Sequence, residues 1–164
     1  MIRLIKDWAL ALVVGIAVFL LADWMSDAPA PKSMTEAPAF TLVNADGGTT
    51  SLAEFKGRTV VVNFWGSWCG PCRKEIPEFA RFAKKHPEVT VLGIAQGSGS
   101  GATLAASAKA LGINYPVLEA TDAVLQDYGV SGYPTTFVVG PDGRIRKSWG
   151  GMIDGFTLEA GIGL

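Results

Sequence analysis

Hydrophobic residues fall into runs whose spacing changes along the chain. Two fully apolar, β-branched runs, Thr59–Trp65 and Val89–Ala95, predict buried central strands, because strands covered on both faces need no polar positions. Apolar residues recur at helical spacing from Cys69 to about His86, which predicts an amphipathic helix. Shorter patterns predict a strand at Phe40–Val43, a helical turn at Ser51–Phe55, helices at Ala102–Leu111, Asp122–Tyr128 and Thr157–Ile162, and a hairpin of Thr135–Val139 with Arg144–Trp149. This order predicts an α/β fold with a mixed β-sheet flanked by helices.

The N-terminal segment has a different pattern, because Trp8–Ala22 contains no polar or charged side chain apart from the indole of Trp8. A membrane-spanning helix needs about 20 residues, and Trp8 and Trp24 suit the two membrane interfaces that would extend this run. Basic residues precede it, which keeps the N-terminus cytoplasmic. We predict that residues 1–25 form a cytoplasmic tip and a transmembrane signal-anchor. A cleavable signal peptide is the alternative, with a poor cleavage site at residues 28–30.

Residues 26–38 are rich in proline, alanine and polar side chains, which predicts an extended linker. Residues 39–164 then form one folded domain. Its expected location is the periplasmic or extracytoplasmic side of the inner, cytoplasmic membrane, in a single-pass protein. The formal net charge of the chain is −1, which gives no reason to expect a nucleic-acid partner.

The only two cysteines, Cys69 and Cys72, flank Gly70 and Pro71 at the point where a buried strand gives way to a helix. Free N–H groups and the dipole at a helix N-terminus stabilise an anion, so we predict that Cys69 is the solvent-accessible, attacking thiolate. Cys72 lies one turn further along, within reach of a disulfide. A structural zinc needs four ligands, more than these two cysteines and a distant His86 supply. An inert structural disulfide is disfavoured, because so small a loop constrains the unfolded chain little. The pair predicts a redox-active Cys69–Cys72 disulfide, with no metal and no cofactor.

The segment Trp68–Cys72 after an apolar strand resembles the active site of the thioredoxin superfamily. A second match lies at Gly132–Phe137, where that superfamily has a cis-proline before a strand, so the resemblance implies that Pro134 is cis and lies against the dithiol. With the N-terminal apolar run, the Asn63–Trp65 strand and the CxxCxxE spacing, the chain is most similar to TlpA/ResA-like membrane-tethered reductases, with DsbE/CcmG-related proteins nearby. The resemblance implies a thioredoxin-like fold from about Phe40 onward.

This resemblance implies a thiol-disulfide oxidoreductase that reduces disulfides in extracytoplasmic proteins, with cytochrome c biogenesis among its possible settings. A membrane electron donor of the DsbD/CcdA type would re-reduce it. The residues expected to dock the protein substrate are Trp68, Gly70, Pro71, Tyr133 and Thr135. An oxidase that introduces disulfides would use the same residues in reverse. A peroxidase would need a threonine where Gly66 stands, and a metal-binding protein of this fold would need more methionine or histidine side chains than His86 provides.

A carboxylate, Glu75, follows Cys72 by three residues and raises the question of proton transfer. Thioredoxin has a buried acid six residues before its first cysteine, and here that position is Asn63, which cannot take a proton. On a helical wheel Glu75 lies on the apolar arc, between Phe79 and Phe82. We predict a buried proton carrier for Cys72, as the TlpA/ResA-like proteins have at this position. The alternative is a boundary residue whose carboxylate bends out to water.

A glycine-rich segment, Gly97–Ala102, fits the pattern G-x-G-x-x-A after a strand and before a helix, and Glu119 follows where a ribose-binding acid would stand. A dinucleotide site is therefore an alternative. It is disfavoured because the domain is too small for both a dinucleotide and a substrate domain. A flexible loop is the simpler interpretation.

Overall fold

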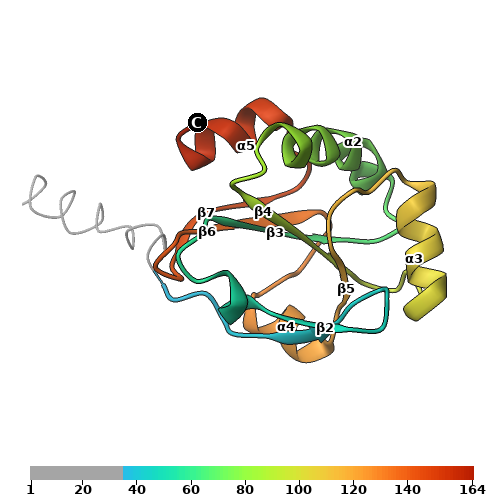
Figure 1. Ribbon diagram of the computed structural model, residues 1–164. Coiled ribbons are helices and arrows are strands. Elements are labelled where there is room, and N and C mark those ends of the chain that lie inside the picture. The colour runs from blue at the N-terminus through green and yellow to red at the C-terminus, as the bar shows by residue number, and fades with distance from the viewer. Residues whose placement is uncertain (1–34) are drawn as a thin grey trace, which may run out of the picture. The chain divides into compact units, whose positions relative to one another are not determined.

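The computed structural model describes residues 35–164, which are coloured in Figure 1. The predicted signal-anchor at residues 1–25 and the linker up to residue 34 lie outside the described residues. No helix among residues 35–164 is long and apolar enough to cross a membrane. The last predicted linker residues already contact the domain, since Ala37 donates its N–H to the carbonyl of Gly143 at 2.8 Å and Thr35 accepts from Ile145 at 3.0 Å.

A five-stranded mixed sheet with the strand order β5-β4-β3-β6-β7 forms the centre of the described domain. Its strands are β3 (Val60–Trp65), β4 (Thr90–Ala95), β5 (Val117–Glu119), β6 (Thr135–Val139) and β7 (Ile145–Gly150). β3 pairs parallel with β4 and antiparallel with β6. The strand that leads into the cysteines is therefore the central strand, as its apolar sequence predicts, with Asn63 as its one polar residue.

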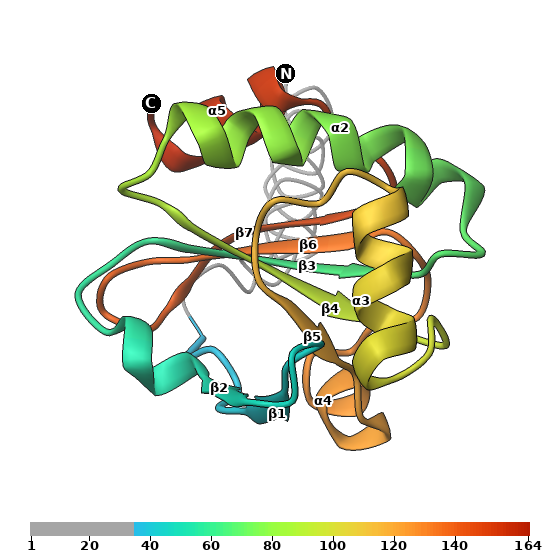
Figure 2. The same ribbon diagram turned by 45° about the vertical axis from the view of Figure 1, so that its right-hand side comes forward.

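Helices cover both faces of the sheet, as Figures 1 and 2 show. One face carries α2 (Gly70–Lys85) and α5 (Gly155–Ile162), with α3 (Gly101–Ala110) beside the start of α2. The other face carries α4 (Asp122–Asp127), the 3-10 helix η1 (Leu52–Phe55) and the pair of β1 (Thr41–Val43) with β2 (Thr49–Ser51). The mixed α/β architecture predicted from the sequence is confirmed.

The sequence does not predict two of the strands, β2 and β5. Each has only three residues, and β2 is entirely polar, with the sequence TTS. β5 follows Pro116, which lacks an N–H for a sheet ladder. Both are strands because of their neighbours: β2 pairs with β1 and β5 with β4.

Alternation along β3 separates the two faces of the core. Val62 and Phe64 pack into the cluster on the side of β1 and α4. Val61 and Trp65 pack into the clusters formed with α2. Asn63 follows the alternation of Val61 and Trp65 and points toward α2. A polar side chain of the central strand therefore meets the buried face of the helix that carries the cysteines.

Candidate active site

Cys69 and Cys72 form a disulfide at the start of α2, with their Cα atoms 5.3 Å apart. Cys69 is the N-cap residue, and its Sγ accepts a hydrogen bond from the backbone N–H of Cys72 at 3.2 Å. Pro71 lies in the first turn, where its missing N–H costs nothing. Sγ of Cys69 thus faces the free N–H groups at the helix start, as predicted.

Cys69 is less exposed to solvent than the sequence predicts. Cys69 is 5% exposed and Cys72 is fully buried. The turn from β3 into α2 packs both cysteines against Trp65 and Ile76, which explains why even the leading cysteine is largely covered. In the disulfide form, Cys69 is therefore only slightly more exposed than Cys72.

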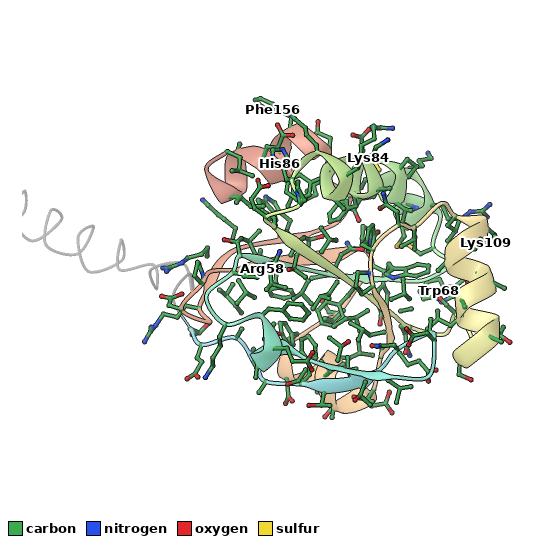
Figure 3. The ribbon with its side chains drawn as sticks, in the orientation of Figure 1. Arg58, Trp68, Lys84, His86, Lys109 and Phe156 are labelled. Carbon is green, nitrogen blue, oxygen red and sulfur yellow. A yellow bond between two sulfur atoms is a disulfide. The ribbon has the colours of Figure 1, made fainter. Side chains whose placement is uncertain are left out.

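Trp68, labelled in Figure 3, directly precedes Cys69 and has an exposed but fixed side chain. Its side chain is among the exposed large hydrophobic groups, at 60%. Its indole N–H donates to the carbonyl of Gln96 at 3.0 Å, and its ring stands edge-on to Tyr133, with centroids 5.4 Å apart. A Cβ at Gly66 would lie 2.7 Å from the indole, so the ring needs glycine there. Sequence reasoning missed Gly66 and Gln96 as supports of this ring.

Tyr133 and Pro134 are joined by a cis peptide bond, as the resemblance to thioredoxins implies. Tyr133 packs against the cluster that contains both cysteines. The carbonyl of Pro134 accepts from the N–H of Gly151 at 2.8 Å. Thr135 begins β6, and its hydroxyl donates to the carbonyl of Gly132 at 2.7 Å. The segment before β6 is therefore fixed by Gly151, by its own hydrogen bond from Thr135 to Gly132, and by the packing of Tyr133 against the cluster that contains the cysteines.

Glu75 is buried, with 1% exposure, as its place on the apolar arc predicts. Its Oε2 accepts from Nδ2 of Asn63 at 3.0 Å, and its Oε1 accepts from the backbone N–H of Ile153 at 2.9 Å. Burial raises the pKa of Glu75 to about 7, although the hydrogen bonds from Ile153 and Asn63 act in the opposite direction. A carboxyl with this pKa can both take up and release a proton near neutral pH.

Further polar groups surround Glu75 in the core. Nδ2 of Asn63 also donates to the hydroxyl of Thr136 on β6 at 3.0 Å. The Trp65 N–H and the Tyr115 hydroxyl are buried and have no hydrogen-bond partner among residues 35–164. The pKa of the Tyr115 phenol is raised, mainly by burial and secondly by the charge of Glu75. Strand alternation is the signal that places Asn63 opposite Glu75, whereas the contact with Ile153 uses a backbone group and leaves no trace in the sequence pattern.

The glycine-rich segment serves the protein's own structure. The N–H of Gly101, at the start of α3, donates to the carboxylate of Glu119 at 2.8 Å. The hydroxyl of Ser98 accepts from the N–H of Ser67 at 2.8 Å and so ties this loop to the turn before the cysteines. Glu119 thus lies at the helix end where a dinucleotide phosphate would bind, which argues against that alternative. Within residues 35–164 no three His, Cys, Asp or Glu side chains are grouped to hold a metal ion.

Comparison with known proteins gives consistent matches. The AhpC/TSA family matches residues 34–148. Thiol-disulfide oxidoreductase ResA of Bacillus subtilis (strain 168) is 33% identical over 151 residues, which cover 89% of this chain and 79% of the relative. Thioredoxin-like protein YneN of the same organism is 32% identical over 132 residues, covering 79% and 78% of the two chains.

Solved structures share the fold. A thiol:disulfide interchange protein of the thioredoxin family from Chlorobium tepidum TLS superposes with a TM-score of 0.71 at 30% identity, covering 79% of this chain and 94% of that one. StoA from Bacillus subtilis superposes with a TM-score of 0.65 at 25% identity, covering 77% and 97%. The thioredoxin-like fold expected from the two sequence motifs is thereby confirmed.

Proposed function

The chain belongs to the AhpC/TSA family and is a ResA-like thiol-disulfide oxidoreductase, and from this premise we propose that it reduces disulfides in partner proteins. The observation that carries the proposal is the Cys69–Cys72 disulfide at the start of α2 with the buried carboxyl of Glu75 one turn away. The cysteines supply the electrons, and Glu75 has the pKa of a group that handles protons near neutral pH.

The reaction runs in two exchanges. With the pair reduced, the Cys69 thiolate attacks one sulfur of the partner's disulfide, forming a mixed disulfide and releasing the other partner sulfur as a thiolate. Cys72 then loses its proton to Glu75 and attacks Sγ of Cys69. The mixed disulfide breaks, the second partner sulfur leaves, and the Cys69–Cys72 disulfide forms. Two electrons pass from the protein to its partner, and the proton on Glu75 can pass to a departing thiolate.

The docking surface follows from the residues around the disulfide. Trp68 offers a fixed apolar ring, and Gly70 and Pro71 are both exposed at the tip of the helix. Tyr133, Pro134 and Thr135 would lie on the partner's side of the cysteines, and the backbone around Tyr133-Pro134 would hold an extended partner chain by strand-like pairing. Since the partner must present a disulfide in an extended segment, unfolded or partly folded proteins fit this surface best.

The setting of the reaction is part of the proposal. The apolar run at residues 8–22 would anchor the protein in the inner membrane, with the domain on the extracytoplasmic side, where protein disulfides persist. A membrane electron donor of the DsbD/CcdA type would restore the dithiol after each cycle. Apocytochrome c is one substrate that fits such a setting, in line with a role in cytochrome c biogenesis.

The reduction potential of the Cys69–Cys72 couple tests the direction of electron flow. Gly70 and Pro71 match thioredoxin, so we expect a value nearer thioredoxin, at about −270 mV, than the oxidant DsbA, at about −120 mV. Equilibration of the full chain with glutathione redox buffers measures it. A potential above roughly −180 mV, the level of a disulfide isomerase, would instead favour an oxidase that introduces disulfides.

A further inference from the structure

When the carboxyl of Glu75 takes up a proton, its two present hydrogen-bond donors no longer both suit it. Both of its oxygens accept from N–H groups, Oε1 from Ile153 and Oε2 from Asn63. A carboxylate can accept both bonds, but a protonated carboxyl has one oxygen that must donate. The backbone N–H of Ile153 can never accept. Oε2, which faces Asn63, is therefore the oxygen whose partner could change from donor to acceptor.

Asn63 can make this change because its amide has a donor end and an acceptor end. Its Nδ2 now directs its hydrogens to Glu75 and to the hydroxyl of Thr136, each at 3.0 Å. A half-turn of the amide would exchange Nδ2 for Oδ1, which has two lone pairs. Oδ1 could then accept from protonated Glu75 and from Thr136, whose hydroxyl can donate as well as accept. Glu75 and Thr136 would remain the partners of Asn63 in both orientations, while the two Nδ2 hydrogens would move to the side on which Oδ1 now lies.

We propose that Asn63 is a positioning residue whose amide turns over with the proton on Glu75, so that the carboxyl stays hydrogen-bonded in both protonation states. The inference rests on the proposed role of Glu75 as proton carrier and explains how that role is possible in a buried site. Asn63, Glu75 and Thr136 are at most 1% exposed, so the three side chains must satisfy one another. An unsatisfied buried polar group would destabilise the folded protein.

An amide suits position 63 because the neighbouring acid, Glu75, needs a donor when it is charged and an acceptor when it is protonated. A leucine of similar size could neither donate nor accept. An aspartate could pair with protonated Glu75 but would repel its carboxylate. The asparagine serves both states, and the raised pKa of Glu75, about 7, means that both states are populated near neutral pH.

Nuclear magnetic resonance of the full chain tests the turnover of the amide. The chain has three asparagines, Asn44, Asn63 and Asn114, so selective labelling of their side chains gives few signals. With the Glu75 carboxyl carbon labelled as well, we expect the Asn63 amide signals to change with the same midpoint as Glu75. Asn44 and Asn114 are internal controls that should not share this midpoint, and Glu75→Gln should abolish the change at Asn63. An Asn63 signal that stays constant, whether or not Glu75 titrates, overturns the inference.

Thr136→Val gives a second test that does not alter either member of the central pair. In Thr136→Val, one Nδ2 hydrogen of Asn63 has no acceptor when Glu75 is charged. When Glu75 is protonated and the amide has turned over, the variant instead leaves one lone pair of Asn63 Oδ1 without a donor. An orphaned buried N–H is the costlier of the two, so the midpoint of Glu75 should rise, by about half a pH unit. Thr136→Ser restores the hydroxyl and should restore the midpoint. An unchanged midpoint in Thr136→Val overturns the inference, and failure of the proposed function would appear separately, in the reduction kinetics of Glu75→Gln.

Discussion

The two ends of α2 are each joined to the region of α5 by a glutamate, but in opposite ways. At the N-terminal end, Glu75 is buried and accepts from Ile153, just before α5. At the C-terminal end, Glu159 of α5 lies nearer the surface and accepts from Lys85 at 2.8 Å and from His86, labelled in Figure 3, at 3.1 Å. Burial raises the pKa of Glu75, whereas the hydrogen bonds from Lys85, and then His86, lower the pKa of Glu159.

The opposite pKa shifts of the two glutamates distinguish a structural contact, that of Glu159, from a contact suited to proton transfer, that of Glu75. Glu159 lies beside the Lys85 cation, which favours its charged form, so it stays ionised and fastens α5 to α2. Among the residues that the structure describes, Glu75 accepts only from the neutral donors Asn63 and Ile153. Its burial makes the carboxylate hard to ionise. A protein that needed Glu75 only for stability would do better with an uncharged side chain there.

The largest expected effect is on stability as a function of pH, with Glu75→Gln compared with the wild type. A carboxyl whose folded pKa is about 7 and whose unfolded pKa is near 4.5 loses its stabilising contribution as pH rises through that window. Relative to Glu75→Gln, the wild type should therefore lose up to about 3 kcal/mol of unfolding free energy between pH 4.5 and pH 7. Urea unfolding of both proteins across this range measures the difference.

Glu159→Gln is the matched control at the other end of α2. Because the pKa of Glu159 is lowered, its contribution is present above its unfolded pKa and is lost as pH falls, the opposite sign to Glu75. The effect should be smaller and should weaken with added salt. Parallel pH dependence in the two variants would contradict the contrast between the two glutamates.

A smaller effect is expected at the N-terminal end of α2, where the alkylation rates of the Cys69 and Cys72 thiols should differ. In the reduced protein we expect Cys69 to react with iodoacetamide at neutral pH at least about tenfold faster than Cys72, because only Cys69 caps the helix and has any exposure. Mass spectrometry of alkylated peptides over time measures both rates. Equal rates in the folded protein would refute the assignment of Cys69 as the attacking thiol.

The smallest effect concerns Tyr115, whose buried hydroxyl has no partner among the described residues. Removing a buried, unpaired hydroxyl while keeping the ring is neutral or stabilising. Tyr115→Phe should therefore leave stability unchanged or raise it by up to about 1 kcal/mol, with the pH dependence due to Glu75 retained. Tyr128→Phe is the contrasting variant, because the Tyr128 hydroxyl donates to the carbonyl of Pro38 at 2.9 Å and its loss should destabilise the fold. A marked loss of stability in Tyr115→Phe would reveal a partner for its hydroxyl.

The elements that are predictable from the sequence are those that carry their own pattern. The apolar run of β3 and the wheel of α2 identify the central strand, the helix and the burial of Glu75 before any contact is known. β2 and β5 have no such pattern, because pairing with a neighbour makes them strands. The same limit applies to the site: the cysteines follow from spacing, whereas the contacts of Glu75 with Asn63 and Ile153 depend on how α2, β3 and the segment before α5 come together.

The role of Glu75 as proton carrier for Cys72 is decided by the pH profile of disulfide reduction by the full chain, in the wild type and in Glu75→Gln. With a small-molecule disulfide as substrate and Glu159→Gln as control, we expect the wild type and the control to share a profile with an inflection near pH 7. Glu75→Gln should lose that inflection and slow the step in which Cys72 attacks Cys69, while its fold stays intact by circular dichroism. Superimposable profiles in the wild type and Glu75→Gln would show that Glu75 is not the proton carrier.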